Sequence, residues 1–426
     1  MRNRNKILTA AAVGAVFTLA LGGCTNSENG STSSGESGST SNGDVTTLTF
    51  WSYYTAGSQA EWLAAQVKKF ETDNPDIKID VIETVGDQQD QKLLASVATG
   101  RGPDLFINNI VVDFPTLAAA GVFADLTPYW EKFADADEFP EASVWKDGDT
   151  VYNLLPYTNL LGMYYNLDIL GEYGITEPPA TLEELQADME VVTADGKYKG
   201  LALSGAPSVE GAWLFAPQLL GEGINYCNFD GPKVGEAFNR LDSWASDGFI
   251  PKAAATWDQN ASWQQFMTGK YAFAFNGNWQ LGGLEDVAFK YGTAQYPKPE
   301  DGFSQVYPGG EGYGIGSQSE HPDLAWKFLE QAILTPEAAD AIFTATGSIP
   351  TRADATDSAA LQGDFVKPFV TAASDPGSWP KNENTAKMQN ALGTEVSSVI
   401  SGQKTGDEGA QAAIKNIADA AAGGGC

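Results

Sequence analysis

Strand-type and helix-type patterns of apolar residues alternate near the start of the chain, and this alternation restricts the fold most. Residues 48–51 are typical of a strand, and a helix with a capping box follows over residues 58–75. Residues 77–81 alternate apolar and polar side chains, as in a second strand, before a helix over residues 87–100. Residues 105–107 read as a third strand. This order predicts a largely parallel α/β architecture.

The rest of the chain continues this style. Thr181 and Glu184 have the spacing of a capping box, which predicts a helix start. Further helices are predicted over residues 214–220, 235–245, 322–334, 389–400 and 410–421, another from Thr335, and a strand at 273–275. A chain of 426 residues exceeds one ordinary hydrophobic core and predicts two lobes.

The N-terminus has the build of a secretory signal peptide over residues 1–23. Basic side chains precede the uncharged apolar run of residues 7–21, and two glycines lead to Cys24. The run is short for a transmembrane helix, which needs about 20 residues. The ending resembles a bacterial lipobox, which implies cleavage before Cys24 and a diacylglycerol on its sulfur. The alternative is an ordinary signal peptide with a chance cysteine.

Residues 24–43 read as a tether behind this cysteine. They are almost entirely Gly, Ser, Thr, Asn and Glu, and such a segment cannot bury enough surface to offset its ordering entropy. We therefore expect a disordered tether that holds a globular body at the extracytoplasmic face of the cell membrane, anchored by lipid.

The acidic composition restricts the partners. The chain has 55 acidic and 25 basic side chains, a formal net charge of −30. Nucleic acid is a poor partner for such a surface, which mildly favours neutral or cationic ligands. No cofactor is expected.

Cysteine and histidine are too few for common catalytic or metal sites. No CxxC or Cys/His cluster exists, so we expect no structural zinc site. Cys227 is interpreted as a buried small hydrophobe rather than a functional thiol, and no role is assigned to Cys426. His321, the only histidine, stands at a predicted helix start, and capping is its simplest role.

A series of short motifs then identifies a family. In order along the chain these are FWSYY (50–54), FETDNP (70–75), GPDL (102–105), NN (108–109), LLP (154–156), MYYN (163–166), PPATLEEL (178–185), MTGKYAF (267–273), NGNW (276–279), GGEG (309–312) and GSIPTR (347–352). Each is weak alone, but together they span nearly the whole mature chain. The chain resembles the extracellular solute-binding lipoproteins of ABC importers, in the carbohydrate-binding branch of the maltose-binding proteins.

The resemblance implies a two-lobed α/β fold of the periplasmic-binding-protein type, with a hinge and an interlobe ligand cleft. It implies an N-terminal lobe of residues 44–153 and 310–347 and a C-terminal lobe of residues 154–309 and 348–422. We place the hinge crossings near residues 149–156, 303–310 and 346–350. Ligand would stabilise a closed state that a membrane permease recognises. A monomer is expected.

Aromatic residues at positions that match the family's cleft are candidates for stacking on sugar C–H faces. They are Tyr53, Tyr54, Trp213, Trp257, Trp279 and Trp379. Trp279 aligns with a position that stacks on sugar, and core packing is the alternative for Trp279 and Trp213. Adjacent strand residues point to opposite faces, so we expect one tyrosine to pack and the other to face the cleft.

Polar candidates would bind hydroxyl groups, which both donate and accept hydrogen bonds. They are Asn108, Asn109, Asp113, Asn276, Gly310 and Glu311. The alternative for Asn108 and Asn109 is a turn, and Asp113 could instead cap a helix at Pro115. Gly310 and Glu311 could instead belong to a flexible connector. Gln389 occupies a position that carries a stacking tryptophan in maltose-binding proteins, which argues against maltose itself.

Three classes of function compete. The favoured hypothesis is a lipid-anchored receptor that captures an oligosaccharide and delivers it to ABC permease subunits; related binding proteins carry non-sugar solutes. A secreted glycoside hydrolase would need two carboxyl groups about 5–10 Å apart across a cleft, and no acidic pair is marked by sequence. A surface adhesin would bind no small molecule. We therefore expect a protein that is not an enzyme.

Overall fold

The computed structural model describes residues 45–54, 57–284, 287–355, 359–380 and 382–421. The signal peptide, Cys24, the tether and Cys426 lie outside the described residues. Residues from Asp44 to Cys426 group as one compact unit. No described helix is both long and apolar enough to cross a membrane.

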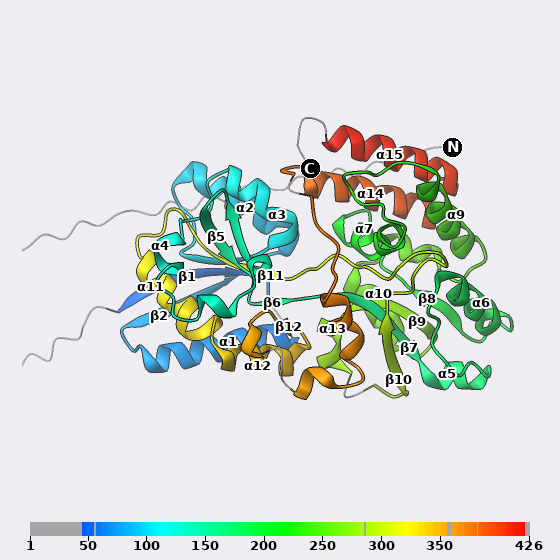
Figure 1. Cartoon of the computed structure of the whole chain (residues 1–426), viewed down its shortest axis with the longest axis horizontal. Coiled ribbons are helices and arrows are strands. Elements are labelled where there is room, and N and C mark those ends of the chain that lie inside the picture. The colour runs from blue at the N-terminus through cyan, green and yellow to red at the C-terminus, as the bar shows by residue number, and fades with distance from the viewer. Residues whose placement is uncertain (1–44, 55–56, 285–286, 356–358, 381, 422–426) are drawn as a thin grey trace, which may run out of the picture. The chain divides into compact units, whose positions relative to one another are not determined.

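A six-stranded mixed sheet organises the first lobe (Figure 1). Its order is β2-β1-β3-β11-β5-β4. The strands are β1 (Thr46–Ser52), β2 (Ile77–Glu83), β3 (Leu105–Asn109), β4 (Val144–Asp147), β5 (Thr150–Leu154) and β11 (Glu311–Ile315). The first three are parallel, as predicted, whereas β11 runs antiparallel between β3 and β5.

Helices cover both faces of this sheet. They are α1 (Gly57–Asp73), α2 (Gly86–Thr99), α3 (Ile110–Ala119), α4 (Thr127–Trp130), α11 (Pro322–Phe328) and α12 (Pro336–Thr346), with the short turns η1 (Ala136–Glu138), η2 (Glu141–Ser143) and η5 (Leu329–Ile333). One core cluster includes Phe50, Tyr313 and Phe328. A second cluster, on the α3 side, includes Phe106 and Phe114.

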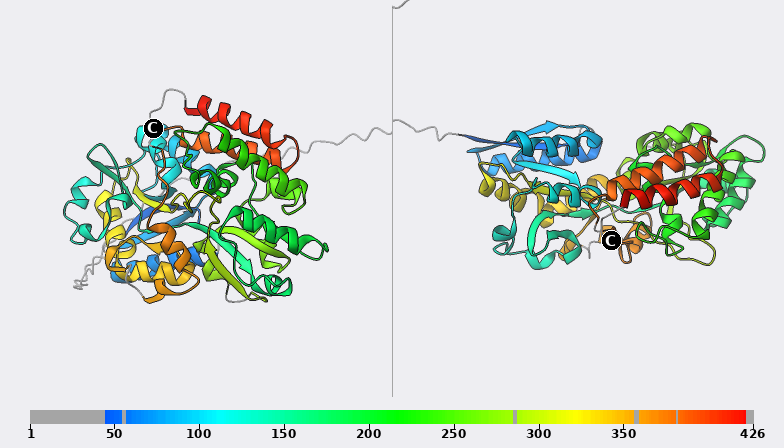
Figure 2. Two further views of the ribbon diagram at one scale, coloured as in Figure 1. Left: turned by 45° about the vertical axis from the view of Figure 1, so that its right-hand side comes forward. Right: turned by 90° about the horizontal axis from the view of Figure 1, so that it is seen from above.

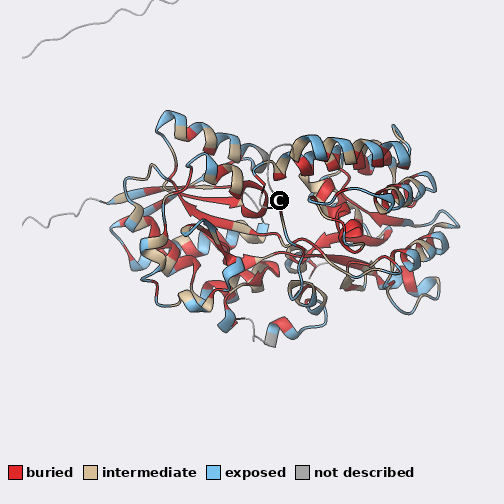
Figure 3. Cartoon of the chain, turned by 45° about the horizontal axis from the view of Figure 1, so that its top comes forward, coloured by how far each residue is buried: buried red, intermediate tan, exposed pale blue. Residues whose placement is uncertain are grey.

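A four-stranded sheet, in the order β10-β7-β9-β8, organises the second lobe. Its strands are β7 (Leu161–Asn166), β8 (Lys199–Ala202), β9 (Tyr271–Gly277) and β10 (Tyr291–Gln295). Strand β9 is buried along its whole length (Figure 3). One large cluster forms the core of this lobe.

The helices of the second lobe come from two distant parts of the chain. They are α5 (Leu167–Glu172), α6 (Leu182–Thr193), α7 (Val209–Phe215), α8 (Pro217–Leu220), α9 (Pro232–Ser246), α10 (Gln259–Met267), α13 (Lys367–Ala373), α14 (Thr385–Ile400) and α15 (Gly406–Ala421), with η3 (Lys252–Thr256), η4 (Asn278–Gly283) and η7 (Ala359–Gln362). The turn η6 (Ala353–Ala355) instead contacts α12 of the first lobe. Helices α14 and α15 lie side by side (Figure 2).

Local signals account for several helix ends. Thr181 and Glu184 form the predicted capping box of α6, and Gly100 ends α2 in a left-handed conformation. Thr335 caps α12 by accepting from the N–H of Ala338 at 3.1 Å. His321 occupies the N-cap position of α11, but its side chain makes no capping bond.

Three crossing segments join the lobes. The first, residues 155–160, follows β5. It overlaps the end of the predicted range of residues 149–156, most of which belongs to the β4–β5 hairpin. The second, residues 296–310, contacts the first through a bridge between Asn159 and Gly309. The third follows α12, where β12 (Ile349–Pro350) pairs with β6 (Tyr157–Thr158). The three segments are therefore hydrogen-bonded neighbours.

Cys227 differs from its interpretation as a buried small hydrophobe. Its side chain is exposed and disulfide-bonded. The other cysteines of the chain, Cys24 and Cys426, both lie outside the described residues. At an exposed position the sulfur is accessible for a covalent link to a distant part of the chain.

Candidate ligand-binding site

Several candidate residues meet at one edge of the first sheet. Strands β1 and β3 end there, so Tyr53, Tyr54 and Asn109 leave the sheet at this edge, and antiparallel β11 begins there with Glu311 opposite Asn109. Open α/β sheets bind ligands at the carboxyl ends of their parallel strands. The topology thus concentrates polar groups where such a fold accepts a ligand.

Glu311 is the centre of a tyrosine cluster. Burial raises the pKa of its carboxyl group, and hydrogen bonds from Tyr54 and Tyr157 oppose that rise. The Tyr54 and Tyr157 hydroxyls are themselves hydrogen-bonded. Oε2 of Glu311 is buried and has no hydrogen-bond partner among the described residues. Such an orphaned acceptor is costly unless a ligand or water donates to it.

The two tyrosines do not point to opposite faces. β1 ends at Ser52, so strand alternation does not extend to them, and their rings contact each other edge-on at 5.8 Å. Tyr54 is buried, and Tyr53 is partly exposed. Burial raises the pKa of Tyr53 well above its usual value, and the charges of Glu311, Asp113 and, more weakly, Asp90 add to the rise. Tyr53 therefore stays a neutral phenol beside several carboxyl groups.

Asp113 is not the cap of a helix at Pro115. Helix α3 begins at Ile110, so Asp113 lies in its first turn and Pro115 lies inside it. The Asp113 side chain is buried and approaches the Tyr53 hydroxyl closely enough to shift its pKa. The structure thus brings Asp113 to the same sheet edge as Glu311.

Asn108 lies inside β3 rather than in a turn. It is fully buried, and its Oδ1 accepts from Nδ2 of Asn153 at 2.7 Å. Nδ2 of Asn108 and Oδ1 of Asn153 lack partners among the described residues. A Cβ atom at Gly312 would lie 2.2 Å from Oδ1 of Asn153, so only glycine fits beside this pair. Together the amides offer one free donor and one free acceptor, which matches a hydroxyl group or a water.

Trp213 and Trp279 form a stacked pair, which we call the tryptophan pair. Their ring centroids are 5.5 Å apart and their planes differ by 14°. Each ring lies over a glycine: a Cβ at Gly277 would lie 1.8 Å from Trp279, and a Cβ at Gly309 would lie 2.6 Å from Trp213. Nε1 of Trp213 is buried without a partner among the described residues. The pair is a stack of two nearly parallel apolar rings with one buried donor that has no partner among the described residues.

Gly310 joins the tryptophan pair to Glu311. Its φ is 136°, and a Cβ there would lie 2.7 Å from the carbonyl oxygen of Tyr157, so only glycine fits. The segment from Gly309 to Glu311 therefore places a stacking surface two residues from an orphaned carboxylate oxygen.

Trp379 contacts the second crossing segment instead of the tryptophan pair. Its Nε1 donates to the carbonyl of Pro308 at 2.7 Å, and its ring stacks on Tyr307 at 4.1 Å. It also packs against the α3-side cluster of the first lobe. Trp379 thus lies where the lobes meet.

Trp257 and Asn276 contact other residues of the second lobe rather than the tryptophan pair or Glu311. The Trp257 ring contacts Tyr271 edge-on at 6.3 Å, at the end of β9 away from Trp279. Nδ2 of Asn276 donates to the Gln259 carbonyl at 3.1 Å, and its Oδ1 accepts from the N–H of Gly277 at 2.9 Å. No described contact links Trp257 to the tryptophan pair.

Sequence reasoning missed three site residues. Tyr157 and Tyr313 surround Glu311, and Asn153 completes the amide pair. Tyr157 directly follows the quoted LLP motif, which was a usable signal. Asn153 and Tyr313 carry no local signal, because sheet pairing alone brings them to the site.

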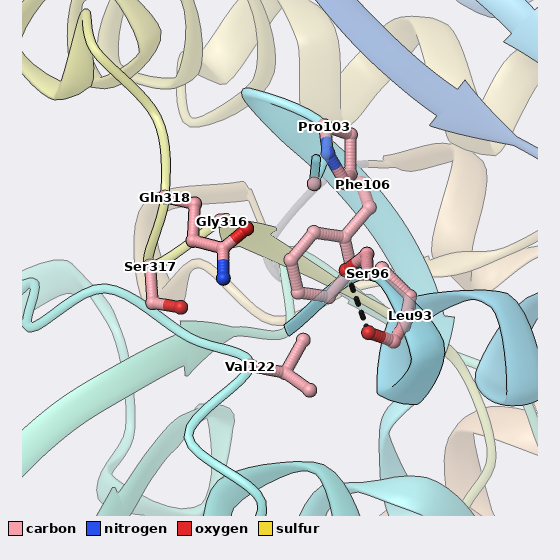
Figure 4. A pocket seen from close by; sticks show the side chains of 9 residues that line it. Leu93, Ser96, Pro103, Phe106, Val122, Gly316, Ser317 and Gln318 are labelled. Atoms are coloured by element: carbon pink, nitrogen blue, oxygen red, sulfur yellow. Dashed lines mark hydrogen bonds between the residues drawn. The ribbon is translucent and has the colours of Figure 1, made fainter. Parts of the chain in front are cut away.

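A small cavity in the first lobe is separate from these groups (Figure 4). It holds about 10 Å³ and is lined by residues such as Ser96, Phe106 and Gln318. That volume admits roughly one water. Across the described part of the chain, no group of three or more His, Cys, Asp or Glu side chains is placed to hold a metal ion.

Comparison with known proteins places this geometry in context. The sequence profile described as "Bacterial extracellular solute-binding protein" matches residues 65–367. A binding protein of Brucella abortus is 27% identical over 280 residues, which cover 62% of this chain and 67% of that protein. The maltodextrin-binding protein of Bacillus subtilis is 25% identical over 340 residues, covering 74% and 78%.

Solved structures share the fold at low identity. An ABC substrate-binding protein from Listeria monocytogenes, in complex with cycloalternan, superposes with a TM-score of 0.76 at 22% identity, covering 88% of this chain and 99% of that one. A maltose-bound protein of T. maritima superposes with a TM-score of 0.80 at 19% identity and the same coverage.

Proposed function

This chain belongs to the family of bacterial extracellular solute-binding proteins, and from that premise we propose that it captures an oligosaccharide between its lobes and delivers it to an ABC permease. The observation that carries the proposal is the tryptophan pair two residues from Glu311. A sugar needs both an apolar surface for its C–H face and acceptors for its hydroxyl groups. Relatives named for maltodextrin and multiple sugars support this ligand class.

The proposed contacts divide by chemistry. Trp213 and Trp279 stack on sugar rings. Glu311 and Asp113 accept hydroxyl protons, and Tyr53 donates or accepts. Asn108, Asn109 and Gly310 supply further polar and backbone contacts, while Tyr54 holds Glu311 in place. Trp379 and the more distant Trp257 and Asn276 extend the candidate set.

Binding is proposed to close the lobes about the three crossing segments. The predicted lobe limits, residues 44–153 with 310–347 and residues 154–309 with 348–422, belong to this proposal. A ligand that contacts both lobes binds the closed state more tightly and so shifts the population toward it. The permease would bind that closed monomer.

Family membership places the protein outside the cytoplasm. We propose further that Cys24 is the lipidated N-terminus of the mature chain. Mass spectrometry of the native N-terminal peptide should show Cys24 with a diacylglycerol mass, and Cys24→Ser should release the protein from membranes. An unmodified mature N-terminus elsewhere would refute the anchor.

The proposal is tested by thermal unfolding of the mature chain with a panel of mono- and oligosaccharides. A ligand at 100 times its Kd adds about 2.7 kcal/mol of stability, which raises the midpoint by a few degrees. A rise with one glycan class supports the receptor. No rise with any neutral sugar shifts the proposal to non-sugar solutes, and cleavage of the saccharide would indicate a hydrolase instead.

A further inference from the structure

Asn278 is a fully buried amide whose hydrogen bonds all reach the crossing region. Its Oδ1 accepts from the N–H of Leu160 at 2.7 Å, and its Nδ2 donates to the carbonyl of Gly347 at 2.6 Å. Its backbone N–H donates to the carbonyl of Leu160 at 3.1 Å. Nδ2 also lies 3.4 Å from Oδ1 of Asn159. Every polar atom of the side chain is therefore in use.

These partners belong to different parts of the molecule. Leu160 and Asn159 are in the first crossing segment, and Gly347 ends α12, a helix that packs on α1 in the first lobe. Asn159 exchanges two backbone hydrogen bonds with Gly309 of the second crossing segment, at 2.9 and 2.7 Å. Asn278 itself follows β9 of the second lobe. One side chain thus links both lobes and two crossing segments.

The space around Gly347 keeps this link tight. Gly347 has a φ of 83°, and a Cβ there would lie 2.5 Å from the carbonyl oxygen of Asn278. A Cβ at Gly282 would lie 2.3 Å from the carbonyl of Ala345. The turn η4 therefore packs closely against the end of α12, where backbone atoms of Asn278 and the side chain of Leu281 both lie against Gly347.

The tryptophan pair rests on the same segments. Trp279 follows Asn278 directly in the chain, and Trp213 lies on Gly309, the bridge partner of Asn159. Both rings therefore pack on backbone that is bonded to Asn278 or to its partner Asn159. A shift of the crossing segments would change the surface on which the rings rest.

We propose that Asn278 is a positioning residue that fixes the tryptophan pair to the hinge, so that stacking of a ligand on Trp279 is transmitted to the lobes. The identity of the ligand in this inference rests on the proposed function, whereas the hydrogen bonds of Asn278 do not depend on it. Asn278 touches no ligand itself. It sets the orientation of Trp279 through its bonds to Leu160 and Gly347, and it loses that control when either bond is removed.

A double-mutant cycle tests the assignment. Asn278→Ser removes the amide, and binding of the best saccharide from the panel should weaken about tenfold, as for loss of a buried hydrogen-bond set. In a Trp279→Ala background the same change should weaken binding less than about twofold, because the ring it positions is gone. Equal effects in both backgrounds would overturn the proposal. If Asn278→Ser does not fold, Asn278→Asp is used in its place. The aspartate keeps the oxygen that accepts from Leu160 and removes the donor to Gly347.

A ligand-free measurement separates this proposal from the proposed function. Acrylamide quenching of Trp279, taken as the difference between each protein and its Trp279→Phe partner, should rise in Asn278→Ser. The matched control is Asn166→Ser, another buried amide, which caps α5 at the opposite end of the second sheet. Unchanged quenching in Asn278→Ser, or an equal rise in the control, would refute the positioning role. Failure of every saccharide to bind wild type would refute the proposed function alone.

Discussion

Adding one methyl group at Gly309 should displace the tryptophan pair. A Cβ there would lie 2.6 Å from Cη2 and 2.7 Å from Cζ2 of Trp213, whereas ordinary contacts are 3.4–4 Å. The ring must therefore retreat by roughly 1 Å. Gly309 does not have a positive φ, so alanine itself is tolerated by the backbone. The predicted effect is steric and confined to the Trp213 ring.

The magnitude follows from overpacking. Extra atoms in a well-packed site cost about 1–3 kcal/mol, so Gly309→Ala should lower the free energy of unfolding by about that amount. A ring displaced by 1 Å also loses a quarter to a half of its dispersion contact with a stacked ligand, and binding should weaken about tenfold. Urea unfolding measures the first effect and titration calorimetry the second.

The refuting result comes from a second background. In Trp213→Ala the new methyl group loses both of its close contacts, because the next nearest atom, the Asn159 carbonyl oxygen, lies at an ordinary distance of 3.5 Å. In that background, Gly309→Ala should leave the free energy of unfolding almost unchanged. Gly235→Ala, which adds the same methyl group to open space on α9, is the matched control. If Gly309→Ala lowers the free energy of unfolding by the same amount in the Trp213→Ala background, contact with the Trp213 ring is not the cause of the destabilisation.

Three further results are expected. Because burial raises the pKa of Glu311, the folded protein holds that proton more tightly than the unfolded chain, and stability falls as pH rises from the unfolded pKa through the folded one. Glu311→Gln should thus become increasingly more stable than wild type over that window in urea unfolding at several pH values, yet bind ligand more weakly; a constant difference between the two proteins would contradict this. Cys227→Ser should lower stability by about 2–4 kcal/mol under oxidising conditions and leave the reduced protein unaffected, with peptide mapping to identify the partner cysteine. Arg352 is 2% exposed and bonds Asp135, Asp354 and the Leu334 carbonyl, so Arg352→Met should cost about 2–4 kcal/mol, and Arg352→Lys, which lacks the planar fork, should not restore it.

Local patterns in the sequence were enough for most elements. The Thr181–Glu184 capping box and the glycine after α2 are confirmed because both depend only on neighbouring residues. The start of α1 was less accurate: the helix begins at Gly57, so Ser58 lies inside it. The two-lobed fold class is also confirmed, and it rested on the order of motifs along the whole chain.

Long-range pairing was beyond local patterns. β11 contains two glycines and no apolar alternation, yet it lies in the middle of the first sheet, because β3 and β5 bond both of its edges. The same pairing brings Glu311 to Tyr54 and Tyr157, and Asn108 to Asn153. Cys227 also shows that local tendency is not enough. The burial tendency of cysteine predicted a core residue, whereas the Cys227 side chain is exposed next to the buried Tyr226.

The position of β11 also determines the order in which the molecule can be completed. β3 and β5 are synthesised early, but the strand between them is made only after all four strands of the second sheet. Until it arrives, both strands present unpaired edges, which are open to aggregation. The second sheet consists of β7 to β10, which precede β11 in the chain, so it can form first. The second crossing segment then leads the chain from this sheet back to the first lobe, where β11 pairs. Folding of the first lobe is therefore a late, non-local step, expected to be slow and to need protection from self-association while the chain is incomplete.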